Sequence, residues 1–518
     1  MSLGTGLLCA FGGAQAFDFQ EGNVRGSIVS TISTGFQVRL QDPDPRLNTY
    51  QNTVWPDAGP PWLGDENYVK GKINSFTVKG IHELELLFPN QWAFFGRFDW
   101  LADMAAENNA KFGLPEDSKD ITSLDIRLLD LYIEKGFELG GRYGQVRVGN
   151  QVLNWGESLF FFGGINYATN PVDINRINLP GGQIKELLLP VPMISTSLAL
   201  SDEVSLEAYY QFGWKGDQFP PVGTMWSTSS FVGPSYKDAL NAILPTFGLG
   251  GAASSKDADD QGQWGMALKY QFPQSGTEIG AYYARYHEKF PWFYWTGDRA
   301  GHVYAEDIDL YGLSFNTDLG NWSLSGELSY RPNDVIALDP FDFSPTGCAG
   351  AGTDCLRKQK RWGFDLVAVH QMAYASEMGW LLRGVGAQGG LLLAEVGGFK
   401  FPGLDADGTD ALVALDADSD FSWGYALEAR LDYEGTLIPG WTVSPGIFFR
   451  HGVKGSSQEL LGWWREGVKE ANIYVTGFNP SNNVSVSLNW LPYWGGSPYK
   501  INDHGDHDVI SANVSITF

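Results

Sequence analysis

The chain ends in the segment ISANVSITF, Ile510–Phe518, and this segment decides the fold class. Every second residue in it, from Ile510 to Phe518, is apolar, and the residues between are Ser, Asn or Thr. Successive side chains of a β-strand point to opposite faces, so the pattern predicts a strand with one apolar and one polar face.

The same alternation recurs along the whole chain, for example in 25–39, 264–272, 423–433 and 484–490. It predicts about eighteen strands, with sixteen as a lower bound. We expect them near 23–40, 71–88, 91–104, 123–139, 143–154, 193–201, 203–215, 262–272, 277–290, 307–317, 321–331, 360–376, 380–397, 420–435, 441–453, 467–479, 482–493 and 507–518.

The connections between these strands alternate between short and long. Pro89-Asn90, Gly140-Gly141 and Pro480-Ser481 are brief turns, whereas the connections at 155–192 and 216–261 are long. Short periplasmic turns and long outer loops are typical of bacterial outer-membrane barrels. We therefore predict an all-β fold, a transmembrane antiparallel β-barrel with short periplasmic turns, long extracellular loops and both termini in the periplasm.

Composition and physics favour a closed barrel over other folds. The chain has 19 Trp, 22 Tyr, 32 Phe and 64 Gly, which fits aromatic girdles and tight turns. It has no apolar run of about 20 residues, which a membrane helix needs. In hydrocarbon every backbone donor must be paired, so an open sheet edge is excluded. A β-propeller would show a repeat of about 40 residues, and none is present.

Charge and motifs exclude other functions. A net charge of −25 argues against nucleic acid as a partner. None of the seven His residues stands in a catalytic spacing, and Gly156-Glu157-Ser158 lacks a second glycine for a nucleophile elbow. The acidic run 405–410 has part of a calcium-loop pattern but no Glu at its twelfth position, which favours a solvated loop. We expect no enzyme, no cofactor and no metal site.

The N-terminus is typical of the end of a secretory signal. Residues 7–11 are apolar, and Ala14-Gln15-Ala16 is a cleavage pattern. We interpret 1–16 as a signal-peptide remnant and 17–518 as one outer-membrane barrel domain. In an oxidising compartment, Cys348 and Cys355 are expected to form a disulfide.

Several motifs follow in order over 124–235, including Asn154-Trp155-Gly156-Glu157-Ser158, Gly163-Gly164-Ile165-Asn166, Asn170-Pro171-Val172-Asp173 and Leu179-Pro180-Gly181-Gly182. With them, the chain resembles a proteobacterial outer-membrane family that is catalogued as a domain of unknown function. The resemblance implies an outer-membrane barrel that works with a periplasmic or lipoprotein partner and an RND-type pump. It implies hydrophobic, lipid-like or aromatic cargo, and a terminal Phe518 that the barrel-assembly machinery recognises.

The connection 155–192 is the main candidate site. It is too long for a simple link and too apolar for disorder. We hypothesise that it folds into the lumen as a constriction; the alternative is an outer loop packed on its neighbours or on another subunit. The residues expected to line the path are Trp155, Glu157, Asn166, Asn170, Asp173, Lys185 and Glu186.

Charged residues on the polar strand faces form a second candidate set. They could tune ion selectivity, or they could pair across the lumen and stabilise the wall; we favour the second interpretation. The set comprises Arg25, Arg39, Arg97, Asp99, Arg147, Glu327, Glu428, Arg430 and Asp432.

The sequence therefore predicts an outer-membrane channel for hydrophobic or aromatic small molecules. A general porin, a docking barrel without transport of its own and a barrel enzyme are the alternatives. Partners are the lipid and lipopolysaccharide of the outer membrane, and a homotrimer is plausible. Cargo identity and the direction of transport do not follow from these residues.

Overall fold

The structure is a computed structural model that describes residues 17–44, 64–161, 163–227, 231–337, 355–404, 420–455, 464–496 and 504–518. Across these ranges, no helix combines the length and apolarity needed to cross a bilayer. The expected signal remnant 1–16, the acidic run 405–410 and Cys348 lie outside the described residues. The signal and the disulfide therefore stay predictions.

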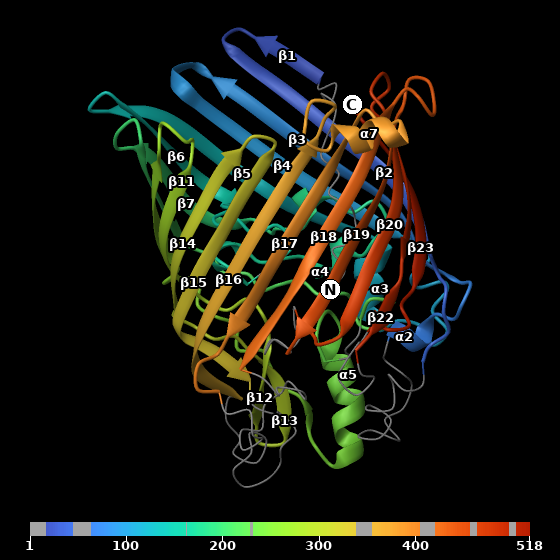
Figure 1. The fold of residues 1–518 in the computed structure, drawn as a ribbon. Helices are drawn as coiled ribbons and strands as arrows, with labels where there is room; N and C mark the ends of the chain where they lie inside the picture. Colours follow the sequence, from blue (N-terminus) through green and yellow to red (C-terminus); the bar gives the residue numbers. More distant parts are fainter. Residues whose placement is uncertain are drawn as a thin grey trace.

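Eighteen antiparallel strands form a closed barrel (Figure 1). Each wall strand pairs with the next one along the chain, and the last closes the ring on the first, from Thr31–Thr517 to Arg39–Val509. The predicted barrel and its strand number are confirmed. The wall strands are β2 (Val24–Arg39), β3 (Ile73–Phe88), β4 (Trp92–Asp103), β5 (Asp125–Leu139), β6 (Arg142–Gln151), β7 (Val191–Ala199), β8 (Val204–Gln211), β10 (Trp264–Gln271), β11 (Glu278–Tyr286), β14 (Ile308–Leu319), β15 (Trp322–Ala337), β16 (Leu356–Met372), β17 (Gly389–Lys400), β18 (Phe421–Glu434), β19 (Thr442–Lys454), β20 (Val468–Asn479), β21 (Val484–Leu491) and β23 (Val509–Thr517).

Shorter elements complete the fold. β1 (Phe17–Glu21) pairs with β2, and β22 (Tyr493–Gly495) pairs with β20. The strands β9 (Gly251–Ala252), β12 (Trp292–Thr296) and β13 (Arg299–Val303) form a separate small sheet. The helices are α2 (Gly64–Asn67), η1 (Pro89–Gln91), α3 (Glu116–Ser123), η2 (Asn166–Ala168), α4 (Ile174–Ile177), η3 (Ile184–Glu186), α5 (Tyr236–Ile243), η4 (Leu244–Phe247) and α7 (Gly379–Val385).

The wall is polar inside and apolar outside, the reverse of a soluble protein. Trp264, Met266 and Leu268 of β10 are 37–48% exposed, whereas Lys79 of β3 and Arg331 of β15 are 2% exposed or less. An apolar outer face is stable only against lipid, because it would otherwise be a large hydrophobic patch in water. This is the polarity that the alternation in the sequence predicts.

Aromatic rings gather on the outer wall toward one rim. Trp264 lies 5.0 Å from Tyr283, and Tyr283 lies 5.3 Å from Tyr311, between ring centroids. Rings of this kind are enriched at the membrane–water interface, where their apolar bodies and polar tips are both solvated. The cluster marks one edge of the apolar band.

The two ends of the barrel differ in the length of their connections. Gly140 and Gly141 join β5 to β6 with φ of 59° and 76°, which a two-residue hairpin turn requires. This end also carries Phe518, β1 and α7, while β12, β13 and α5 lie at the other end (Figure 1). Which end faces the periplasm stays a prediction.

The predicted strand 380–397 is wrong in its first half. Residues 379–385 form helix α7, which ends at Gly386 with φ of 75°, and the strand runs from Gly389 to Lys400. Leu382 is fully buried and packs with Met372, while Trp380 is 64% exposed. Apolar residues in this run fit both a helical and a strand period, so alternation alone could not separate them.

Candidate functional site

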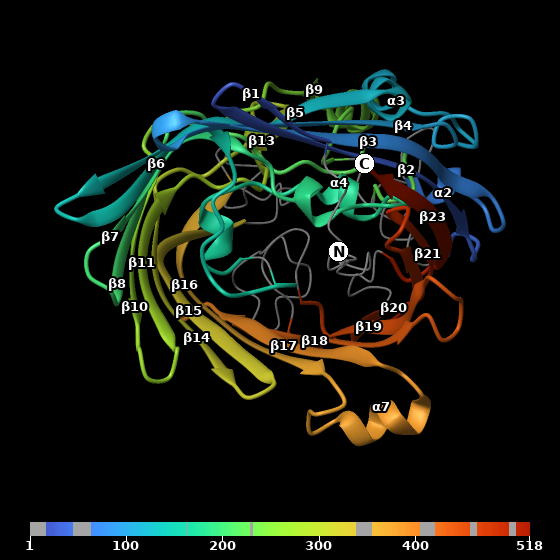
Figure 2. The same cartoon turned by 90° about the horizontal axis from the view of Figure 1, so that it is seen from above.

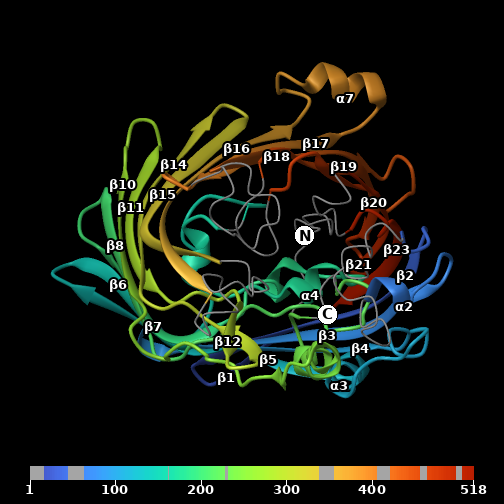
Figure 3. The same ribbon diagram turned by 90° about the horizontal axis from the view of Figure 1, so that it is seen from below.

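The connection between β6 and β7, residues 152–190, lies inside the barrel, and we call it the inner segment. Views along the barrel from both ends place its helix α4 within the ring of strands (Figures 2 and 3). Its aromatic residues pack on the inner wall: Phe160 lies 4.9 Å from Phe448, and Phe161 lies 4.8 Å from Phe399. The segment therefore occupies the volume that a wide barrel would otherwise leave to water.

Two buried wall carboxylates hold the backbone of the inner segment. Glu327 on β15 accepts the amide N–H groups of Glu157 and Ile165, each at 2.8 Å. Glu395 on β17 accepts those of Leu159 at 2.9 Å and Phe160 at 2.6 Å. Hydrogen bonds to an ionised acceptor are stronger than neutral ones. The part of the segment from Glu157 to Ile165 is thus fixed to strands β15 and β17.

Glycines allow this close approach. A Cβ at Gly164 would lie 1.8 Å from Glu327 Oε1, and Gly163 adopts a φ of 118° that favours glycine. Arg331 donates to the Gly164 carbonyl at 2.7 Å. The Gly163-Gly164 pair of the sequence motif is therefore explained by contact between backbone and wall.

Ion pairs hold the far part of the inner segment to the opposite wall. Lys79 on β3 pairs with Glu186, and both side chains are 2% exposed or less. Lys185 reaches Glu83 of β3 at 2.8 Å. On β5, Arg127 pairs with Asp173, and Asp125 accepts a hydrogen bond from Arg176 at 2.5 Å. The segment is therefore tied across the barrel, from β15 and β17 to β3 and β5.

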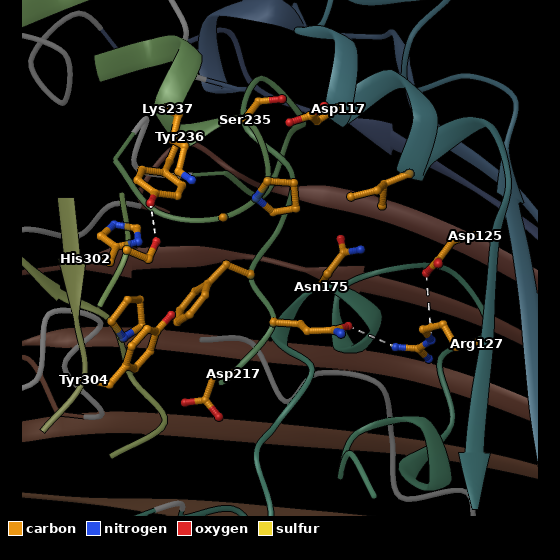
Figure 4. Close-up of a pocket in the computed structure, with 17 residues that line it drawn as sticks. Asp117, Asp125, Arg127, Asn175, Asp217, Ser235, Tyr236, Lys237, His302 and Tyr304 are labelled. Atoms are coloured by element: carbon orange, nitrogen blue, oxygen red, sulfur yellow. Dashed lines mark hydrogen bonds and ion pairs between the residues drawn. The ribbon is translucent and has the colours of Figure 1, made fainter. Parts of the chain in front are cut away.

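A cavity of about 500 Å³ lies between the inner segment and the longer connections (Figure 4). Tyr236, His302 and Tyr304 lie on one side, Asp125 and Arg127 on the other. Helices α3, α4 and α5 and the small sheet contribute to its lining. Ligand pockets commonly have volumes of about 300–1,000 Å³.

Groups of His, Cys, Asp and Glu that could hold a metal ion are not found in the described part of the chain. Glu327 and Glu395 of the wall instead accept backbone amides, and Asp99 pairs with Arg127.

A family model described as "Protein of unknown function (DUF1302)" matches residues 1–518. The chain belongs to DUF1302. The resemblance to an outer-membrane family catalogued as a domain of unknown function is thereby confirmed. No curated protein matches this DUF1302 chain.

Solved structures are similar to the DUF1302 chain at low identity. OccAB1 of Acinetobacter baumannii is 13% identical, with 98% of each chain covered and a TM-score of 0.44. The outer membrane protein OpdK of Pseudomonas aeruginosa is 11% identical, with 95% of this chain and 98% of that chain covered and a TM-score of 0.41. The outer membrane channel DcaP of Acinetobacter baumannii is 9% identical, with 96% and 99% covered and a TM-score of 0.39. The fold assignment rests on the strand pairing of the DUF1302 chain itself.

The seven residues predicted for the inner segment fall into two groups. Glu157 and Lys185 are partly exposed. The other five are buried and bond to the wall or to the segment's own backbone; Trp155 donates to Glu207 at 2.8 Å, and Asn170 accepts from the Leu153 amide at 2.9 Å. The contacts of these five residues help to fix the segment in place, and the predicted role of the residues in lining a path stays a prediction. The five are Trp155, Asn166, Asn170, Asp173 and Glu186.

Among the described residues, the predicted lumen charges have partners, with the exception of Arg25. This arrangement favours the interpretation that they stabilise the wall; their effect on ion selectivity stays a prediction. The partners are Asp506 for Arg39, Glu83 and Asp130 for Arg97, Arg127 for Asp99, Glu134 for Arg147, the segment backbone for Glu327, Tyr474 for Glu428, and Arg430 and Asp432 for each other.

Arg25 does not meet the expectation for a lumen charge. It is exposed, and it lies before Thr31, where the pairing between β2 and β23 begins. At Arg25 the strand instead pairs with Gln20 of β1. Alternation gives the face of a residue but not its height along the barrel.

Phe518 and Cys355, for which the sequence predicts an assembly signal and a disulfide, both lie in the described part of the chain. Phe518 follows β23 and exchanges backbone hydrogen bonds with Ser30 of β2 at 2.7 and 2.9 Å, with its ring 54% exposed. Its role as an assembly signal stays a prediction. Cys355 is fully buried beside the small sheet, in a cluster with Phe293 and Trp295.

Sequence reasoning missed a partly buried polar cluster that joins the inner segment to two other connections. The Tyr167 hydroxyl lies 2.9 Å from Asp217 and 2.7 Å from Glu288. Asp217 also accepts the Val172 amide at 2.8 Å, and Lys289 donates to the Tyr167 carbonyl at 2.9 Å. These residues stand in connections without alternation, so no pattern could have found them. Glu395 stands in a strand, but its face of β17 also carries the buried Leu391, Leu393 and Phe399, so alternation does not single it out either.

Burial sets the protonation of this cluster. It raises the pKa of Asp217 to about 7, because the carboxylate loses its hydration, and it lowers the pKa of Lys289. Between about pH 4 and 7 the docked segment holds a proton on Asp217 that the undocked segment releases. Docking is therefore expected to weaken as pH rises through this range.

Hydrogen exchange at the Val172 amide, corrected for the intrinsic rate, measures this effect. We expect the opening free energy to fall by up to about 1.4 kcal/mol per pH unit between about pH 4 and 7. Asp217→Asn should abolish the slope. Asp260→Asn is the matched control, since Asp260 caps the Trp214 amide in the same connection but is exposed. A slope that survives in Asp217→Asn would contradict the assignment.

Proposed function

We propose that this chain is an outer-membrane channel for hydrophobic or aromatic small molecules, and that its inner segment restricts the path. The observation that carries the proposal is a wide barrel whose interior is filled by a segment that buried polar contacts to the wall hold in place, together with apolar packing. A polar interior keeps water and a path for solutes available once the segment shifts.

Placement in the outer membrane is part of the proposal. Its support is the apolar outer face with an aromatic rim, because closed barrels with these features are the spanning structures of that membrane. Lipid and lipopolysaccharide then contact the outer wall. Polar side chains on the inner wall support transport, whereas catalysis would need a nucleophile and a base arranged together.

Conductance in planar bilayers tests the channel and the constriction together. The full chain is expected to give small single-channel currents, and deletion of 159–187 is expected to raise them severalfold, because conduction scales with the open cross-section. Equal currents before and after deletion would rule out a constriction by this segment.

The alternatives are separate outcomes of the same measurement. A large, unselective current from the full chain would favour a general porin. No current from either form, although both fold, would favour a docking barrel. Uptake of an aromatic solute faster than a sugar of equal size into vesicles would support the hydrophobic cargo.

Partners implied by the resemblance belong to the proposal as well. A periplasmic or lipoprotein partner and an RND-type pump would give such a channel an energy source and a direction. Co-purification of the tagged full chain from crosslinked membranes tests this, and mass measurement in detergent tests a homotrimer. A monomeric barrel that recovers neither partner would argue for a passive channel.

A further inference from the structure

The cavity in Figure 4 differs from the rest of the interior in the chemistry of its walls. Tyr236 stacks on His302 with ring centroids 3.9 Å apart and an interplanar angle of 19°. Tyr304 and Phe219 also line the cavity. Flat aromatic walls favour a flat aromatic ligand, because stacked rings gain more than burial of area alone.

Two polar groups in the cavity are not used by the fold. The side-chain amide of Asn175, on α4 of the inner segment, and the hydroxyl of Tyr304 make no hydrogen bond with any residue that the structure describes. Both side chains are only partly buried, so water can satisfy them when the cavity is empty. A ligand with a donor or acceptor would replace that water and bond to them directly.

The charges around the cavity do not favour an anion. Asp117, Asp125 and Asp217 line it against Arg127 and Lys237. The guanidinium of Arg127 is already engaged by Asp99 and Asp173, and Lys237 is exposed.

His302 adds no positive charge to the cavity. Burial lowers the pKa of His302 to about 4, so its ring is neutral near pH 7. An aromatic carboxylate would therefore lose hydration and gain only the exposed, solvent-screened ammonium of Lys237, in a lining that also holds Asp117, Asp125 and Asp217.

We infer that this cavity is a capture site for an uncharged aromatic molecule that carries a hydroxyl or a similar hydrogen-bonding group, and that it discriminates against aromatic carboxylates. The inference rests on the proposed function, for which it would supply the first binding step between the longer connections and the inner segment. Because Asn175 belongs to the inner segment, occupancy of the cavity contacts the element that fills the barrel.

Binding of naphthol and naphthoate to the purified full-length barrel in lipid nanodiscs tests this. At about pH 7.5 naphthol is neutral and naphthoate is an anion of nearly the same shape. We expect saturable naphthol binding, and at least about tenfold weaker binding of naphthoate. Asn175→Leu and Tyr304→Phe should each weaken naphthol binding by about three- to tenfold, the effect of one lost hydrogen bond.

Asn175→Trp fills the cavity and should abolish saturable binding, which separates it from partition into lipid. Asn482→Leu, in the short turn between β20 and β21, is the matched control and should bind like the wild type. Equal binding of both probes, or binding that Asn175→Trp does not change, would overturn the inference.

The outcomes also separate this inference from the proposed function. Conduction without naphthol binding would support the proposed channel and refute the capture site. If the barrel never conducts but binds naphthol in a way that depends on Asn175, the capture site is supported and the proposed channel is refuted.

Discussion

Lys79→Met is expected to destabilise the folded barrel by about 3–5 kcal/mol, because it leaves the carboxylate of Glu186 buried without its partner. Both side chains are 2% exposed or less, and Glu186 is further fixed by the backbone amide of Gln183 at 2.8 Å. Urea-dependent unfolding in lipid vesicles, followed by tryptophan fluorescence, measures the change.

The double variant Lys79→Met/Glu186→Gln is the control. Replacement of a buried ion pair by neutral groups of similar size is often nearly neutral, and the side-chain carbonyl introduced by Glu186→Gln can still accept from the backbone amide of Gln183. We expect the double variant to recover most of the lost stability. If it is as unstable as Lys79→Met alone, the penalty comes from lost packing and the ion-pair explanation is incorrect.

Leu313→Arg is expected to cost up to about 2–4 kcal/mol, since an arginine on the lipid face within the apolar band must be desolvated. Leu313 lies near the middle of β14, is 55% exposed, and stands between Tyr311 and Phe315 on the same outer face. The same unfolding measurement applies, with refolding yield into vesicles as a second readout.

Leu319→Arg provides the matched control on the same strand. Leu319 is the last residue of β14, is 59% exposed and faces the same side, but it lies at the end of the apolar band. Arginine near the interface costs only about 0–1 kcal/mol. Equal losses at both positions would mean that the outer wall does not face a bilayer.

The alternation of apolar and polar residues predicted most of the strands of the fold. In β23 and β10 the apolar residues are on the outside and the polar ones on the inside, as their order in the sequence predicts. This works because a wall with lipid on one face and polar groups on the other has a strict period of two. Where a connection is itself apolar, as at residues 379–385, the period is lost and a helix was missed.

The candidate site could be predicted only in part. Length and apolarity identified the inner segment, and alternation put Glu327 on the inner face. Neither could show that Glu327 holds a backbone 162 and 170 residues away, since that depends on how the segment crosses the barrel. For the same reason the ion pairs of Asp173 with Arg127 and of Glu186 with Lys79 could not be predicted.

The distance along the chain between Leu159 and its anchor Glu395, 236 positions, has a consequence for biogenesis. The anchors on β15 and β17 are synthesised long after the segment that they hold, and the seam between β2 and β23 joins two strands at opposite ends of the barrel sequence. High contact order makes such folding slow. The inner segment, although encoded early, can therefore be fixed only once β17 is in place, and defects in these anchors should show as delayed maturation before they show as lost function.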